Sequence, residues 1–213
     1  CSWFGDSGSM KSFLSIDLGL SVAASLNAWH GQYIRLSGPV FGIIGEGFNG
    51  ANRRVMAWSL YHGRDPQTIP FFISNRPARF LEKEGTAELA KAVDEMAAAH
   101  GTPVLIIIDT LNRNFGPGDE NSTADMTRFI QAIDDSLRNR YQCAILIIHH
   151  SGLAANDRAR GASALRASLD WEYKLQKNSD GSRTLTCTKA KEHAQHAPMC
   201  FMHEEIKIDR WID

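Results

Sequence analysis

A lysine and a serine, Lys11 and Ser12, stand between a glycine- and serine-rich stretch and an apolar periodic run. Such a turn before a helix presents backbone N–H groups to phosphate oxygens, and the helix dipole adds to the attraction. In the pattern G-x-x-x-x-G-K-[ST], the lysine reaches the β- and γ-phosphates and the serine hydroxyl reaches Mg²⁺. Met10 stands where the second glycine is expected, so a serine-rich turn without a phosphate is the alternative. The predicted nucleotide-binding residues are Gly5, Asp6, Ser7, Gly8, Ser9, Met10, Lys11, Ser12 and Phe13.

Two carboxylates stand where apolar runs end. Asp109 follows the run 104–108, and Glu46 follows the run 39–44 after one glycine. An acid at the carboxyl end of a buried parallel strand faces a ligand crevice and can hold Mg²⁺, so Asp109 and Ser12 are the predicted metal ligands. Glu46 can polarise the water that attacks a γ-phosphate. The alternatives are a turn aspartate at position 109 and a solvated loop glutamate at position 46.

Histidines and arginines follow the next apolar run, 144–148. His149 and His150 are adjacent, so their side chains point to opposite faces of a strand. One of them can sense a γ-phosphate, or the pair is one buried and one exposed histidine. The segment 154–166 is predicted to be a loop whose arginines contact a nucleic-acid backbone, and a solvated basic loop is the alternative. Its predicted DNA-binding residues are Arg158, Arg160 and Arg166.

The last third of the chain holds a pair of lysines and several potential metal ligands. Lys189 and Lys191 share one face of a predicted strand end, where they can reach a neighbouring subunit's nucleotide. Edge lysines that discourage aggregation are the alternative. The histidines and cysteines nearby match no zinc-finger spacing, so we expect exposed loop histidines rather than a zinc site.

The composition excludes some classes of protein. The 213-residue chain has a net charge of −1, which excludes a protein that coats nucleic acid through overall basicity but allows local basic loops. No apolar run reaches the length of a membrane span, and no signal peptide is visible. The four cysteines form no C-x-x-C pair, and Cys143 is expected to be a buried thiol. We therefore expect a cytoplasmic protein with no membrane partner.

Apolar segments with helical periodicity alternate with short apolar runs along the chain. This alternation predicts an α/β protein with a mostly parallel β-sheet and helices on both faces. Two alternating segments around Asp180 and Gly181 predict an antiparallel hairpin at one edge. The expected helices span 11–29, 49–62, 84–100 and 123–140, and the expected strands 39–44, 69–73, 104–108 and 144–148. We expect a single domain over 1–213 that is a fragment, because only residues 1–4 can form a strand before the glycine-rich turn.

Taken together, these motifs resemble the RecA-like ATPases of plasmid RepA-type hexameric replicative helicases and their phage relatives. The resemblance covers nearly the whole chain. The stretches that carry it are 5–13, 45–58, 109–116, 119–126, 149–152 and 160–165.

The resemblance implies a role for individual residues. Lys11 and Ser12 match the phosphate-binding pair, Glu46 the catalytic glutamate, and His150 the histidine sensor. Asp109 matches the acid of the second nucleotide motif, and Lys189 with Lys191 matches the basic finger that RecA-like rings donate to the next subunit. There are two departures: Met10 replaces the last glycine of the P-loop, and Asp170 stands where the plasmid helicase carries an arginine finger. Activation in trans is then expected from Lys189, Lys191 or Arg160.

The resemblance implies an ATP-hydrolysing motor domain of a ring-forming DNA helicase in replication, with ATP and Mg²⁺ as cofactors. The expected partners are single-stranded DNA, further copies of the chain in a hexamer, and replication proteins. The loop 112–121 with Arg113, and the segment 151–166, are expected to face DNA. One alternative is a RecA-like ATPase that loads or remodels proteins on DNA without unwinding it. Another is a nucleotide-binding assembly module that does not hydrolyse ATP.

Overall fold

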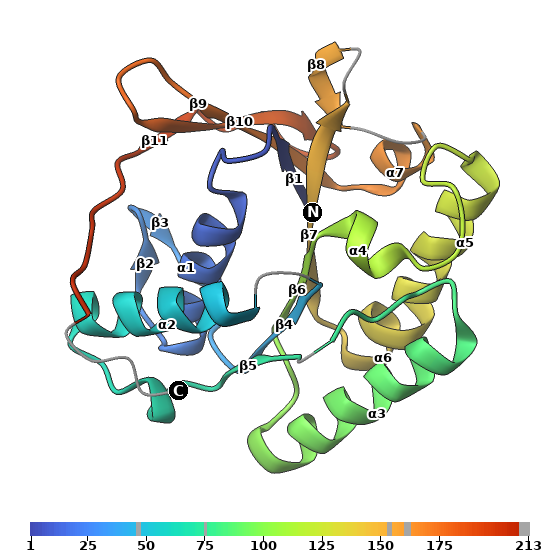
Figure 1. Cartoon of the computed structure of the whole chain (residues 1–213), viewed down its shortest axis with the longest axis horizontal. Coiled ribbons are helices and arrows are strands. Elements are labelled where there is room, and N and C mark those ends of the chain that lie inside the picture. Colours follow the sequence, from blue (N-terminus) through green and yellow to red (C-terminus); the bar gives the residue numbers. More distant parts are fainter. Residues whose placement is uncertain (46–47, 75, 153–154, 160–162, 209–213) are drawn as a thin grey trace.

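The computed structural model describes residues 1–45, 48–74, 76–152, 155–159 and 163–208 of the chain. Its main sheet has the strand order β11-β10-β9-β1-β7-β6-β4-β5, with β8 paired to β7 (Figure 1). Neighbouring strands from β9 to β5 are parallel, whereas β10 and β11 continue the sheet in antiparallel fashion. The predicted fold class is therefore confirmed: a RecA-like, mostly parallel sheet with an antiparallel hairpin at one edge.

The strands of the main sheet are β1 (Ser2–Gly5), β4 (Val40–Ile44), β5 (Phe71–Ile73), β6 (Leu105–Asp109), β7 (Ala144–Gly152), β8 (Ala155–Ala159), β9 (Trp171–Lys177), β10 (Arg183–Ala190) and β11 (Met199–Phe201). A separate small hairpin joins β2 (Ala28–Trp29) and β3 (Gln32–Tyr33). The helices are α1 (Lys11–Ala23), α2 (Phe48–His62), α3 (Lys83–His100), α4 (Leu111–Phe115), α5 (Thr123–Ile133), α6 (Asn139–Tyr141) and α7 (Ser163–Ser168). A 3₁₀ turn covers Pro66–Thr68, and a π-helical turn, Asp134–Arg138, joins α5 to α6.

Each face of the sheet is covered by its own apolar layer. Helices α1 and α2 lie on one face, and α3 to α7 lie on the other (Figure 1). Strand β6 shows why its sequence is continuously apolar. Ile106 and Ile108 belong to the core under α3 and α5, whereas Leu105 and Ile107 belong to the core under α1 and α2. Because successive side chains of a strand alternate between faces, a strand covered on both sides needs apolar residues at every position.

Helix α1 is shorter than the predicted helix 11–29. It ends at Ala23, where Leu26 N–H donates to the Ser21 carbonyl and Ser25 N–H donates to the Val22 carbonyl. Ser25 has a φ of 55°, so this is a Schellman-type end with serine in the position that glycine usually takes. Because neither glycine nor proline stands there, no residue type marked the end of the helix, and two residues that were expected to continue it form β2.

Two segments that were expected to be loops contain regular structure. Residues 112–121 begin with helix α4, and residues 154–166 include strand β8 and the start of α7. Strand β7 is also longer than the predicted 144–148, because it continues to Gly152 and pairs with β8. Both expectations were therefore wrong about local structure. The predicted hairpin was right but incomplete, since β11 adds a third antiparallel strand.

Candidate nucleotide site

The glycine-rich turn lies between the end of β1 and the start of α1. Gly5 is the last residue of β1, and a Cβ atom there would stand 2.2 Å from the Leu175 carbonyl oxygen of β9. Only glycine fits this close approach of two strands. The loop then leads directly into α1, whose first residue is Lys11, so the free N–H groups of the helix face the loop. The geometry is that of the strand–turn–helix which the motif requires.

Lys11 points back into its own loop. Its side chain is buried, and Nζ donates to the carbonyl oxygens of Gly5 (2.9 Å) and Asp6 (2.8 Å) and to Ser9 Oγ (3.3 Å). Burial lowers the pKa of Lys11, and the negative charges of Asp109 and Asp6 oppose that shift. Phosphate oxygens placed in the loop would offer this ammonium stronger, charged acceptors than carbonyl groups.

Met10 adopts a backbone conformation that favours glycine. Its φ of 72° and ψ of 24° lie in the left-handed region, and Gly8, two residues earlier, also has a positive φ, of 77°. The P-loop pattern has glycine at position 10 for the same reason, since a Cβ atom is strained there. In this loop methionine therefore stands, in a left-handed conformation, at the position where the P-loop pattern has glycine.

We expect the Met10→Gly variant to be more stable than Met10→Ala by about 1 kcal/mol, because both lose the methionine side chain and only alanine keeps a strained Cβ atom. Urea denaturation of the two variants measures the difference. If Met10→Ala were equally or more stable, the left-handed conformation at position 10 would be wrong.

Asp109 lies at the same edge of the sheet as the loop. It is the last residue of β6, is buried, and pairs in register with Ile148 of β7 and Ile44 of β4. Strand β7 separates β6 from β1, so two parallel strands end on either side of it, at the crevice where such sheets bind ligands. The charge of Asp109 acts on Lys11, which places the predicted metal ligand and the phosphate-binding lysine in one electrostatic neighbourhood.

The two histidines divide as the strand geometry requires. His149 is 1% exposed and His150 is half-buried, on the strand that lies beside β1. His150 is paired in register with Gly5, the residue that begins the glycine-rich turn. The predicted sensor histidine therefore lies on β7 beside the end of the strand that leads into the P-loop, and its role stays a prediction.

Helix α4 fixes the loops around this edge. The buried Asn114 accepts a hydrogen bond from Ala78 N–H (2.9 Å) and donates to the carbonyl of Thr110 (2.9 Å). A Cβ atom on Gly45 would stand 2.4 Å from Cβ of Arg113. Glycine is thus required at position 45, directly before Glu46, because any side chain there would collide with α4. Glu46 itself lies outside the described residues, and Arg113, predicted to bind DNA, is exposed on α4.

Arg54 is a residue of this site that the sequence analysis missed. Its guanidinium carbon lies 4.1 Å from the ring centre of Phe13, next to Ser12, and burial lowers its pKa while Asp109 opposes the shift. The signal was present in the sequence, because α2 begins two residues after Glu46 and its two adjacent arginines are its only Lys, Arg, Asp or Glu residues. A cation beside the first turn of α1 is placed to meet a bound nucleotide.

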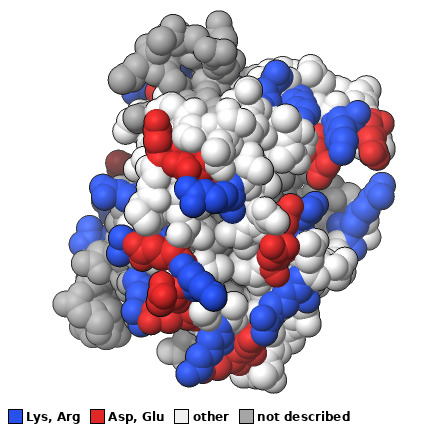
Figure 2. Space-filling model, turned by 90° about the vertical axis from the view of Figure 1, so that its right-hand side faces the viewer, with Lys and Arg blue, Asp and Glu red and all other residues white. Residues whose placement is uncertain are grey.

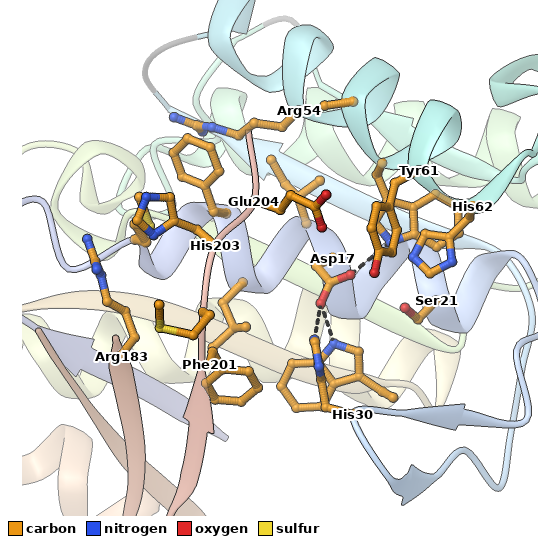
Figure 3. A pocket seen from close by; sticks show the side chains of 18 of the residues that line it. Asp17, Ser21, His30, Arg54, Tyr61, His62, Arg183, Phe201, His203 and Glu204 are labelled. Atoms are coloured by element: carbon orange, nitrogen blue, oxygen red, sulfur yellow. Dashed lines mark hydrogen bonds and ion pairs between the residues drawn. The ribbon is translucent and has the colours of Figure 1, made fainter. Parts of the chain in front are cut away.

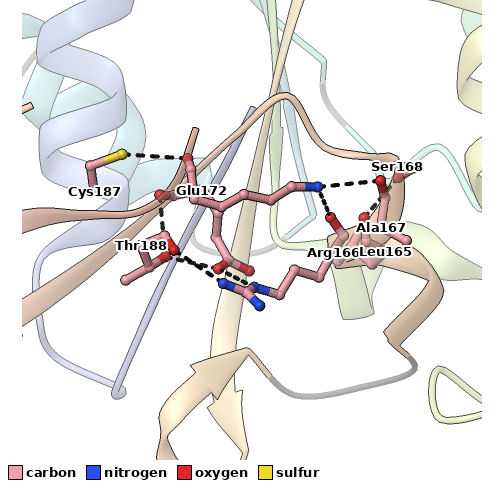
Figure 4. Close-up of polar contacts among 8 residues, drawn as sticks. Leu165, Arg166, Ala167, Ser168, Glu172, Cys187 and Thr188 are labelled. Atoms are coloured by element: carbon pink, nitrogen blue, oxygen red, sulfur yellow. Dashed lines mark hydrogen bonds and ion pairs between the residues drawn. The ribbon is translucent and has the colours of Figure 1, made fainter. Parts of the chain in front are cut away.

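The predicted DNA-binding arginines have different outcomes. Arg160 lies outside the described residues, and Arg158 belongs to strand β8. Arg166 is tied to the protein (Figure 4): its Nε donates to Glu172 Oε2 (2.9 Å) and its guanidinium donates to the Thr188 carbonyl (3.0 Å). Thr188 Oγ1 also donates to Glu172 Oε2 (2.8 Å). Because Glu172 is only 2% exposed, Arg166 supplies the counter-charge for a buried carboxylate.

We expect Arg166→Ala to destabilise the fold by about 1–3 kcal/mol, since it leaves the buried Glu172 carboxylate without its cation; the half-exposed position of Arg166 moderates the loss. Urea denaturation tests this. Adding Glu172→Gln to Arg166→Ala should restore part of the stability, because no buried charge then remains. Equal losses in the single and the double variant would contradict the pairing.

Lys189 and Lys191 lie away from the P-loop of their own chain. Lys189 pairs in register with Glu172, which in turn pairs with Ser2 at the start of β1, whereas the P-loop follows the end of β1. Lys189 Nζ donates to the Arg166 carbonyl (2.5 Å), and Lys191 Nζ lies 3.9 Å from Asp170 Oδ1. Strand β10 ends at Ala190, one residue earlier than predicted, so Lys191 stands just beyond it.

The described residues contain no group of three or more histidine, cysteine or acidic side chains that could hold a metal ion. Instead, His193 and His196 stack on Trp171, with ring centres 5.7 Å and 4.9 Å apart. Cys143 is buried as predicted, and burial raises the pKa of its thiol to about 11. In the part of the chain that the structure covers, no helix is both long and apolar enough to cross a membrane.

Comparison with known proteins agrees with this geometry. The model of a family described as an AAA domain matches residues 1–156, from β1 into β8. This range contains the glycine-rich turn, Glu46, Asp109 and both histidines. No curated protein matches the chain.

Proposed function

The chain belongs to the AAA domain family of P-loop ATPases, and from that membership we propose that it is the ATP-hydrolysing motor domain of a ring-forming DNA helicase that acts in replication. The ATP-hydrolysis part of this proposal is supported by one observation: Lys11 and Asp109 lie at the carboxyl edge of the same parallel sheet. In P-loop ATPases, a lysine at this position binds the β- and γ-phosphates, and the acid helps to hold the metal ion.

Mg²⁺ fits the groups at this edge. The Asp109 carboxylate and the Ser12 hydroxyl are oxygen ligands, which Mg²⁺ prefers together with water and phosphate oxygens. When bound, the ion would neutralise charge on the β- and γ-phosphates. Lys11 would bind the same phosphates, Glu46 would orient and polarise the attacking water, and His150 would respond to the γ-phosphate through its position beside Gly5.

The link to DNA rests on strands β7 and β8. Strand β7 carries His149 and His150 and then continues to Gly152, where it pairs with β8, the strand that contains Arg158. Figure 1 shows β8 projecting beyond the body of the sheet. Nucleotide-dependent movement at the histidines would therefore pass along one ribbon to a projecting segment whose sequence includes Arg158. This arrangement supports coupling between ATP state and DNA contact.

The outer face over α3, α5 and α6 offers no comparable surface. Figure 2 shows Lys and Arg interspersed there with Asp and Glu. Several of these charges form pairs, such as Arg140 with Asp94, Arg138 with Asp134, and Arg128 with Asp125. Paired surface charges have little left to attract a phosphate backbone. The proposal therefore places DNA at the projecting β7–β8 segment and not on this helical face.

We expect the Arg158→Ala/Arg160→Ala variant to bind single-stranded DNA more weakly and with a shallower salt dependence. Each lost phosphate contact should reduce the slope of log K against log[salt] by about 0.7, so two should reduce it by about 1.4. Fluorescence anisotropy over a salt series measures both. The control is Arg76→Ala/Arg128→Ala, which removes two exposed arginines elsewhere. An unchanged slope in the first variant would move the DNA site.

Strand displacement separates the proposed function from its alternatives. A helicase motor releases phosphate faster with single-stranded DNA and displaces a strand from a forked duplex in the presence of ATP. An ATPase that loads or remodels proteins on DNA shows the first activity without the second. An assembly module shows neither, although it binds ATP. Size-exclusion chromatography with and without ATP and Mg²⁺ tests the ring.

A further inference from the structure

A cavity of about 470 Å³ lies between α1, α2 and the chain that follows β11 (Figure 3). Its size is that of a small-molecule site, for which about 300–1,000 Å³ is usual. Met10 and Phe13 line it, and these two residues flank the phosphate-binding pair Lys11 and Ser12. The cavity therefore begins where the predicted phosphate site ends.

The cavity follows one face of α1 away from the phosphates. Phe13, Asp17 and Ser21 all line it, and their spacing of four residues places them in a row along the helix. Asp17 comes six residues after Lys11, which is about 9 Å along the helix axis. This distance suits the ribose and base of a nucleotide whose phosphates lie at the start of α1.

The inner end of the cavity has a fixed aromatic wall. Asp17 accepts hydrogen bonds from the indole Nε1 of Trp29 (2.7 Å) and of Trp58 (2.8 Å), and its Oδ2 lies within hydrogen-bond distance of His30 Nε2 (2.8 Å). Three partners from different elements thus hold one carboxylate. The ring centres of Trp58 and His62 lie 4.1 Å apart with the planes tilted by 32°, and burial lowers the pKa of His62, which favours its neutral form. Flat, rigid aromatic groups of this kind suit a planar base.

The outer wall comes from the end of the described chain. Phe201, His203 and Glu204 line the cavity, and Figure 3 shows Arg54 and Arg183 on the side away from Tyr61 and His62. Cations at that end and aromatic groups at the other match a molecule with phosphates at one end and a ring system at the other.

We propose that this cavity binds the base and ribose of the nucleotide whose phosphates lie at Lys11 and Ser12, with the chain after β11 as its outer wall. The proposal rests on the proposed nucleotide-binding function and adds where the nucleoside lies. The nucleoside is then enclosed by one chain, whatever a neighbouring subunit adds at the phosphates.

Calorimetry with ADP and with inorganic pyrophosphate, both with Mg²⁺, tests this, since pyrophosphate has the phosphates without the nucleoside. ADP should bind the parent protein about 10- to 100-fold more tightly. Ala57→Leu, which fills the cavity from α2, should weaken ADP binding at least about tenfold and change pyrophosphate binding less than about twofold. Tyr61→Ala, at the exposed rim, is a second variant for the same comparison of ADP with pyrophosphate, and it adds no bulk to the interior. Asn52→Leu, an exposed position on the same helix, is the matched control.

Equal affinities of the parent protein for ADP and pyrophosphate would overturn the proposal. So would an Ala57→Leu variant that loses both ligands to the same extent, or one that keeps ADP affinity. If the parent protein binds pyrophosphate but gains nothing from the nucleoside, the phosphate site stands and the cavity assignment alone fails. If it binds neither ligand, the proposed nucleotide function itself is overturned.

Discussion

Replacing Glu46 by glutamine should slow ATP hydrolysis by about 10²–10⁴-fold and leave ATP bound, because glutamine keeps the size of the side chain but cannot polarise the attacking water. Lys11→Ala should instead lose ATP binding. Lys11 Nζ lies in the loop, 2.9 Å and 2.8 Å from two carbonyl oxygens, so it is in place to bind phosphates there. Phosphate release measures turnover, and a fluorescent ATP analogue measures binding.

The two variants together distinguish the roles. A Glu46→Gln protein that hydrolyses ATP at the parent rate would mean that another group activates water. A Lys11→Ala protein that binds the analogue as tightly as the parent would mean that the glycine-rich turn is not a phosphate site. Glu82→Gln is a matched control, because Glu82 is paired with Arg79 before α3 and belongs to no part of the proposed site.

The sequence predicted the sheet well because its strands are buried on both faces. The continuous apolar runs that became β4, β6 and β7 occur only where helices cover both sides, so these runs also predicted helices on either face. Once the strands are parallel, residues at their carboxyl ends must meet. The sequence therefore placed three residues at one edge of the sheet before any distance between them was known: Lys11, Asp109 and His150.

What could not be predicted depends on contacts between distant segments. Arg166 looked like a free loop arginine, and only the pairing of β9 with β10 shows that a buried glutamate, Glu172, needs its charge. The cavity beside Phe13 likewise requires α1, α2 and the chain after β11 to come together, and no local pattern records that arrangement. Helix α4 was missed because Asn114, which anchors it, has partners up to 71 residues away.

The last expected result concerns an active site that is shared between two neighbouring subunits. In phosphoryl transfer, negative charge builds up on the γ-oxygens in the transition state, and a cation from a neighbouring subunit can be worth about 10³–10⁵ in rate. Lys189 lies level with the start of β1 and not at its P-loop end, and Lys191 follows it just beyond β10. We therefore expect these lysines to act on the nucleotide of another chain rather than on that of their own. Their present partners, carbonyl oxygens and Asp170, are ones that a phosphate can replace.

We expect Lys189→Ala/Lys191→Ala subunits and Lys11→Ala subunits each to be nearly inactive alone, and mixtures of the two to regain part of the ATPase activity. Recovery arises at interfaces where an intact P-loop meets intact lysines. Phosphate release over a series of mixing ratios measures it, and native mass spectrometry verifies that the two kinds of subunit assemble together. As a control, Lys91→Ala removes a lysine on α3 that pairs with Glu95 on the exposed helix surface, and it should leave activity unchanged. Co-assembled mixtures that stay inactive would place the two lysines and the P-loop on the same side of the site, and the shared site would be abandoned.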